Sequence, residues 1–234
     1  MNNNPIIVAL DVESAQEARE MVNRLGHLVD FYKVGMELYA ASGMEMVREL
    51  TGQGKKVFLD LKLYDIPETV KRAVSQVSRS GATFLTVHAV GSTMRAAAEG
   101  REGSLQLLAV TVLTSFGPED IRELGYTCDA SELVATRTRQ AMTAGVQGIV
   151  TSPLEVATVR AITGPVAILV TPGVRSAGKA LGDQKRVATP GEAIRNGANY
   201  LVMGRQITRA ADPKSEAARV LEEIEEARSL TSSI

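Results

Sequence analysis

Short apolar runs rich in β-branched residues alternate along the chain with longer stretches in which apolar residues recur at helical spacing. Runs of the first kind predict strands, and stretches of the second kind predict amphipathic helices. The alternation from end to end is typical of repeated βα units around a parallel sheet. The predicted strands are IIVALDV (6–12), FYKVGME (31–37), KVFLDLKL (56–63), TFLTVHAV (83–90), LQLLAVTVLT (105–114), GIVTS (148–152), VAILVTPGV (166–174) and NYLVMGR (199–205).

Helical patterns fill the spaces between these strands, and several begin with a capping residue or proline and end at glycine, as helices prefer. The predicted helices are 14–25, 43–53, 67–80, 92–100, 131–145, 153–162, 189–197 and 214–230. Eight strand and helix units predict an α/β fold, a (β/α)8 TIM barrel in which residues 1–234 form a single domain. A doubly wound sheet is the alternative, but no G-x-G-x-x-G follows the first predicted strand.

Composition narrows the functional classes. Hydrophobic residues make up 44% of the 234 positions, enough for one barrel-sized core. Lys and Arg total 26 and Asp and Glu total 27, so no net field attracts nucleic acid or an anionic membrane surface. The single Cys128 cannot form an internal disulfide, and no apolar run approaches the ~20 residues of a membrane span. We therefore expect a cytoplasmic protein without nucleic-acid or membrane partners.

Polar side chains gather at the ends of the predicted strands. The stretch FLDLKLYDIPETV (58–70) places Asp60 and Lys62 two positions apart on a buried strand and Asp65 in the loop beyond it. The strand period of two directs Asp60 and Lys62 to the same face. These charges form either a layer of structural ion pairs or a functional site. A functional site is favoured, because apolar residues at these buried positions would stabilise the fold better than charges do. The other polar residues of this kind are Asp11, Lys33, His88, Thr114, Arg175 and Arg205.

The last two loops point to a phosphate. A TIM barrel commonly binds phosphate with the loops after its seventh and eighth strands. Here those loops are TPGVRSAGKALGDQKR and MGRQITRA, and Arg175 in the first and Arg205 in the second each offer a forked donor to phosphate oxygens. Pro172 and Gly173 predict a tight turn, and Gly204 permits a close backbone approach. Gln184 lies in the same long loop, and we expect it at the ligand.

Taken together, the strand-end motifs resemble those of the orotidine 5'-phosphate decarboxylase family, whose members convert orotidine 5'-monophosphate (OMP) into uridine 5'-monophosphate (UMP) in pyrimidine synthesis. D-x-K-x-x-D is shared with related families, whereas the ordered set is specific. One departure is Ser92 in HAVGST, where a second glycine is expected, and it bears only on the start of a short helix. The motifs are ALDV (9–12), KVGMEL (33–38), FLDLKLYDIPETV (58–70), TVHA (86–89), LTS (113–115), VTPGVR (170–175), DQKRVATP (183–190) and MGRQIT (203–208).

The resemblance implies chemistry without a cofactor or a metal. Loss of CO2 from the pyrimidine leaves a carbanion at C6 that has no electron sink, so the protein must stabilise the charge electrostatically and deliver a proton. In the implied arrangement Lys62 donates that proton and Asp60 faces the substrate carboxylate, where crowding of like charges is relieved as CO2 departs. Lys33 and Asp65 keep Lys62 charged and aimed.

The resemblance also implies binding roles and a homodimer. The Asp65 loop and Thr69 come from the partner subunit, so that each active site is shared. The implied contacts are ribose with Asp11 and Lys33, the pyrimidine edge with Thr114 and Ser115, and phosphate with Arg175, Gln184, Gly204 and Arg205, next to the turn at Pro172. His88 is interpreted as a structural residue, because a lone strand histidine is more often structural than a ligand.

Three alternatives stay open. A metal-dependent sugar-phosphate decarboxylase or aldolase of the same superfamily also carries D-x-K-x-x-D, but it places a carboxylate near the position of Lys33. A Schiff-base aldolase would need Lys62 as a neutral amine, whereas the flanking aspartates favour its charged form. A non-catalytic barrel that binds a nucleotide phosphate would need the arginine loops and none of the Asp and Lys array.

Overall fold

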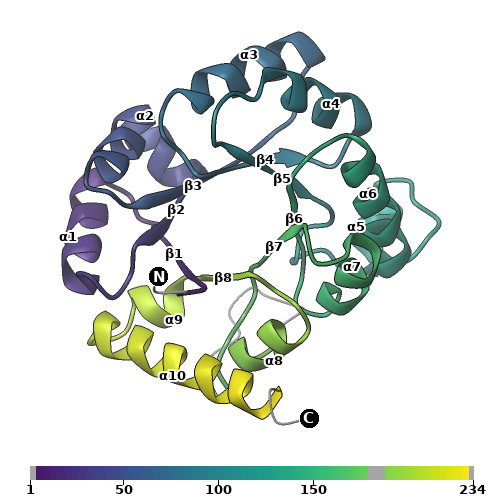
Figure 1. The fold of residues 1–234 in the computed structure, drawn as a ribbon. Coiled ribbons are helices and arrows are strands. Elements are labelled where there is room, and N and C mark those ends of the chain that lie inside the picture. Colours follow the sequence, from purple (N-terminus) through teal and green to yellow (C-terminus); the bar gives the residue numbers. More distant parts are fainter. Residues whose placement is uncertain (1–3, 179–187, 232–234) are drawn as a thin grey trace.

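The structure is a computed structural model that describes residues 4–178 and 188–231, and its strands close into a barrel. Each strand pairs in parallel with the next, and β1 pairs with β8 to complete the ring (Figure 1). This confirms the predicted (β/α)8 TIM barrel. The strands are β1 Ile6–Ala9, β2 Phe31–Gly35, β3 Lys56–Leu63, β4 Phe84–His88, β5 Gln106–Val110, β6 Gly148–Val150, β7 Ile168–Thr171 and β8 Tyr200–Met203.

Helices form a ring around the barrel, and the C-terminal helix α10 lies outside α8 and α9, against which it packs (Figure 1). The helices are α1 Ala15–Leu25, α2 Met36–Gly52, α3 Pro67–Ser78, α4 Gly91–Gly100, α5 Pro118–Glu123, α6 Ala130–Thr143, α7 Val156–Thr163, α8 Pro190–Arg195, α9 Arg205–Thr208 and α10 Pro213–Thr231. None of the helices in the described ranges has both the length and the apolar character that crossing a membrane requires.

Aromatic side chains close the end of the barrel at which the strands begin. Phe31 and Phe84, each the first residue of its strand, lie 5.1 Å apart between ring centroids, and Tyr200 packs edge-on against both at 5.4 and 5.5 Å. Phe58 joins this layer, at 6.0 Å from Phe84. Because side chains alternate along a strand, the residues two positions later also point into the barrel, nearer its other end. The inward positions above the aromatic layer are therefore available to polar groups.

Several predicted boundaries are wrong, most of all at the C-terminal ends of strands. The first strand ends at Ala9 and the fifth at Val110, so Asp11 and Thr114 lie in loops. Residues from Met36 onward form α2, which bends at Gly43, and Arg205 begins α9. At the rim of the barrel the apolar pattern continues while strand pairing stops, so hydrophobicity alone overextends the strands other than β3, whose predicted bounds agree with the structure. The short helix α5 was not predicted.

Candidate active site

Four charged side chains of alternating sign form a row at the C-terminal end of the barrel. The Lys33 ammonium donates to Asp11 Oδ1 at 2.7 Å and lies 3.8 Å from Asp60 Oδ2. The Lys62 ammonium donates to the same Asp60 oxygen at 2.9 Å. The order Asp11, Lys33, Asp60, Lys62 therefore runs from the loop after β1 across β2 to β3. Each interior charge has an opposite charge on both sides, which offsets the cost of removing it from water.

The fold places Lys33 and Asp60 by strand alternation from the aromatic layer. Lys33 follows Phe31 by two positions on β2, and Asp60 follows Phe58 by two positions on β3. Both side chains are largely buried, with 11% and 13% of their surfaces exposed. A glycine keeps the space beside them open, because a Cβ on Gly35 would lie 2.9 Å from Lys33 Nζ and 3.2 Å from Asp11 Oδ1.

The spacing of Asp60 and Lys62 predicts a regular pleated strand, but the backbone of β3 is irregular at Lys62. Its φ is +49°, the one positive value at a non-glycine residue in the described part of the chain, and β3 shifts register against β4 between Leu59 and Leu63. The buried Thr86 of β4 supports the irregularity: its hydroxyl accepts a bond from the Lys62 amide at 2.9 Å and donates to Asp60 Oδ1 at 2.9 Å. A left-handed non-glycine residue is strained, and such strain is concentrated at functional sites.

Thr86 lies in the motif TVHA (86–89) but was given no role from the sequence, although its place two residues after Phe84 on β4 is a signal for an inward side chain. The register shift itself leaves no trace in the hydrophobic pattern.

Asp65 and Thr69 face outward, away from this row. The run from Tyr64 to Thr69 is exposed, including the apolar Tyr64 and Ile66 at 66% and 67%. Asp65 accepts a hydrogen bond from the Ile66 amide at 2.6 Å, and no ion pair of Asp65 is found within the described ranges. The prediction that Asp65 lies beyond the strand is confirmed, and within one chain Asp65 does not join the row.

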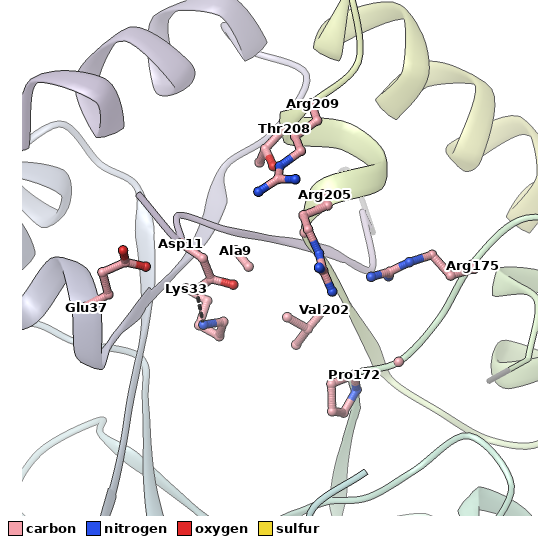
Figure 2. A pocket seen from close by; sticks show the side chains of 12 residues that line it. Ala9, Asp11, Lys33, Glu37, Pro172, Arg175, Val202, Arg205, Thr208 and Arg209 are labelled. Atoms are coloured by element: carbon pink, nitrogen blue, oxygen red, sulfur yellow. Dashed lines mark hydrogen bonds and ion pairs between the residues drawn. The ribbon is translucent and has the colours of Figure 1, made fainter. Parts of the chain in front are cut away.

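A cavity of about 350 Å³ lies beside the row and between the last two loops (Figure 2). Arg205 extends into it from the start of α9 and Arg175 from the segment after β7, and their guanidinium ends point toward each other above Val202 and Pro172. Gly204 lies at its wall, and Glu37, Thr208 and Arg209, which were not among the predicted site residues, line it as well. Arg209 lies one helical turn after Arg205, a spacing that could have indicated it.

A second cavity, of about 150 Å³, adjoins the first at Lys33, Pro172 and Val202. Its wall includes Asp60 and Lys62 together with the apolar Phe58, Val110, Val112 and Val150. Thr114 also lines it, whereas Ser115 is exposed and lines neither of these two cavities. Gln184 lies outside the described residues. The two cavities together offer a cationic end at the arginines and a smaller end in which apolar side chains surround Asp60 and Lys62.

The pKa values of two residues near the site, Arg175 and His88, are lowered. Burial, followed by the positive charge of Arg205, lowers the pKa of Arg175. Burial, followed by the charges of Arg137 and Lys62, lowers the pKa of His88, so its imidazole is neutral at neutral pH. His88 packs edge-on against Tyr64 at 5.7 Å. Both arginines line the larger cavity, so their charges can act on one ligand there.

Residues 4–220 match the model of the "Orotidine 5'-phosphate decarboxylase / HUMPS family". The chain belongs to this family. Proteins named orotidine 5'-phosphate decarboxylase from Rhodopseudomonas palustris (strain HaA2) and Bradyrhizobium diazoefficiens are 51% and 52% identical to it, over 95% of this chain and 95% and 94% of their own lengths. A crystal structure of orotidine 5'-phosphate decarboxylase from Lactobacillus acidophilus matches with a TM-score of 0.83 and 35% identity, over 94% of this chain and 99% of that one. The resemblance seen in the strand-end motifs is thereby confirmed.

The charge row makes a prediction about stability. Asp60→Asn leaves Lys33 and Lys62 close together without the carboxylate between them, so we expect the free energy of unfolding to fall by about 1–3 kcal/mol. Asp30→Asn is the matched control, because Asp30 pairs with Lys56 at 3.4 Å while both side chains are about half exposed. An exposed pair of this kind contributes roughly 0–1 kcal/mol. Urea unfolding of both variants measures the difference, and equal losses would show that burial of the row has no energetic weight.

Proposed function

We propose that this protein decarboxylates OMP to UMP, and the observation that supports it most is the row Asp11, Lys33, Asp60, Lys62 beside a cavity that ends at two arginines. Family membership narrows the chemistry, and the row supplies the groups for it. OMP has an anionic phosphate at one end and an acidic pyrimidine at the other. The two joined cavities offer this same division between a cationic end and an apolar end that holds the row.

The proposed reaction breaks the bond between C6 and the carboxylate carbon. CO2 leaves, the electron pair remains at C6, and the Lys62 ammonium transfers one proton to that carbon, so the net change consumes one proton and needs no cofactor or metal. Lys62 is the candidate donor because it lines the smaller cavity and its Nζ lies 2.9 Å from Asp60 Oδ2. Fixed charges around a developing carbanion lower its energy without the reorganisation that water would need.

Asp60 is proposed to face the substrate carboxylate. A carboxylate at this place disfavours the bound ground state, and the repulsion ends when CO2 departs. Thr86 holds one Asp60 oxygen and Lys62 the other, so the carboxylate cannot turn away from the substrate. Lys33 lies between Asp11 and Asp60 and is proposed to bind ribose together with Asp11 while keeping the row in order.

The phosphate is proposed to lie between Arg175 and Arg205, with Gly204 at the wall and Gln184 as a further ligand implied by the resemblance. Two cations that repel each other in the unliganded protein gain most from a dianion between them. The pyrimidine is then directed into the smaller cavity, past Pro172 and toward Thr114 and Ser115.

Each active site is further proposed to be completed by the partner subunit of a homodimer, through Asp65 and Thr69. The support is the exposed run from Tyr64 to Thr69, directly after the strand that holds Asp60 and Lys62. Exposed apolar side chains next to a site are typical of protein interfaces. We further propose that residues 1–234 form a single domain and that the protein is cytoplasmic; both proposals are supported by the sequence alone.

The activity and its independence of metals can be tested together. We expect the purified protein to convert OMP to UMP, followed by ultraviolet absorbance, with the same rate before and after treatment with EDTA. The reason is the Lys33 ammonium, which stands between Asp11 and Asp60 and would repel a divalent cation there. Loss of activity in EDTA and recovery with Mg2+ would favour the metal-dependent alternative, and no reaction with OMP would refute the proposed function.

The shared site predicts complementation between two inactive variants. Lys62→Ala and Asp65→Ala should each lose activity, while an exchanged mixture regains it, because heterodimers combine both defects in one site and leave the other intact. Statistical exchange makes half of the dimers mixed, so roughly a quarter of the wild-type activity should return. A mixture that stays inactive after exchange has been verified with differently tagged chains would contradict sharing.

Arg205 is predicted to affect catalysis although it lies at the phosphate end of the cavity. Removing a forked, charge-assisted donor should lower kcat/KM for OMP by roughly 100-fold or more, through a strongly raised KM and a lower kcat, because remote binding energy helps to organise the reacting centre. Orotidine, which lacks the phosphate, should be turned over almost equally poorly by Arg205→Ala and by the wild type. Arg72→Ala, at an exposed pair with Glu68, is the control. An equal loss on both substrates would make Arg205 a structural residue.

A further inference from the structure

The residues that directly follow the two cavity arginines are joined to each other. Ser176, next to Arg175, donates its amide to Gln206 Oε1 at 3.1 Å, and Gln206, next to Arg205, donates its side-chain amide to Ser176 Oγ at 2.8 Å. These reciprocal bonds link the segment after β7 to α9 across 30 positions of sequence. They connect the backbone segments from which both arginines extend.

Helix α10 anchors this pair from outside the barrel. Gln206 donates to Glu216 Oε1 at 3.0 Å, and Ser176 donates its hydroxyl to Glu223 Oε2 at 2.7 Å. Arg219 donates to Ser176 Oγ at 3.0 Å and bonds Glu216 at 2.8 Å. Ser176 is 4% exposed, and its hydroxyl therefore donates one bond and accepts two without help from water. A buried hydroxyl whose hydrogen bonds are all satisfied holds its partners in one geometry, even though Arg219 at the edge of the network is partly exposed.

The arginines need such support because they repel each other. The charge of Arg205 is one of the two causes that lower the pKa of Arg175. Two cations on unlinked backbone segments would move apart, and bringing them together again would reduce the affinity for any anion. A link between their backbones sets the separation of the two side chains before the anion arrives.

From this geometry we infer that Ser176 and Gln206, anchored by α10, are positioning residues that fix the spacing of Arg175 and Arg205 for a phosphate monoester. The inference rests on the proposed function for the identity of the substrate, while the anion-binding part stands without it. Neither residue lines the cavity, so both act through the arginines.

The inference predicts a loss that depends on the phosphate. Gln206→Leu keeps the approximate size of the side chain and removes its three hydrogen bonds, so we expect KM for OMP to rise roughly tenfold. Turnover of orotidine should be unchanged, because a ligand without phosphate does not use the spacing. Ser176→Ala removes the hydroxyl but keeps the backbone amide bond to Gln206 Oε1, so we expect a smaller rise in KM for OMP. The double variant should lose little more than Gln206→Leu, which already breaks both bonds between the two residues.

A matched control is available in Gln16→Leu. Gln16 lies on α1, donates to Glu20 at 2.8 Å and is exposed, so the same chemical change there leaves the arginines untouched. We expect wild-type KM for OMP in this variant. Thermal unfolding of all variants shows whether the Gln206→Leu protein is folded, and the conservative Gln206→Asn provides a second, milder disturbance if it is not.

Calorimetry with inorganic phosphate separates this inference from the proposed function. Weaker phosphate binding by Gln206→Leu than by the wild type and Gln16→Leu supports the inference even if the wild type leaves OMP unchanged, a result that would refute only the proposed function. Unchanged KM for OMP and unchanged phosphate binding would overturn the inference. So would an equal loss of activity on OMP and orotidine, which would show that the network serves only stability.

Discussion

The carboxylate of Asp60 is the group around which the site is arranged. One of its oxygens accepts the Lys62 ammonium and lies near Lys33, while the other accepts the Thr86 hydroxyl. Three neighbouring strands, β2, β3 and β4, thus meet at one side chain. A single charge that binds several partners in a partly buried place costs little only while all partners stay in position. The ion pairs and hydrogen bonds that make the buried charges tolerable therefore also hold the row rigid. A rigid row of charges suits electrostatic stabilisation of an intermediate.

The barrel separates stability from chemistry along its axis. The aromatic layer of Phe31, Phe58, Phe84 and Tyr200 fills the end at which the strands begin, and the inward positions beyond it hold the polar residues. Burial of large aromatic side chains stabilises the fold enough for the opposite end to accept charges and backbone strain. The strained φ of Lys62 is held where strand pairing and the Thr86 hydroxyl constrain it from two sides.

The eight strands could be predicted because apolar alternation is a local property, and the charges at their ends could be assigned to one rim because parallel strands share their direction. The C-terminal ends of the strands could not be predicted, because the sequence shows an apolar residue at the rim in the same way whether or not its backbone pairs with a neighbouring strand. A regular strand was predicted to direct Asp60 and Lys62 to the same face, whereas in the structure the two side chains meet across an irregular part of β3. The roles of Thr86 and of the Ser176 and Gln206 pair depend on contacts between distant parts of the sequence, and no local pattern carries that information.

The pairing of β1 with β8 has a consequence for biosynthesis. A ribosome releases the chain from its N-terminus, so Asp11 emerges early, while β8, Arg205 and α10 emerge last. Until they do, β1 has only one neighbour and the cavity lacks its wall. A nascent chain therefore has no place to bind a nucleotide, and a ligand cannot assist its folding before translation of these elements is finished. Only chaperones or the chain's own local contacts protect the open sheet edge during that interval.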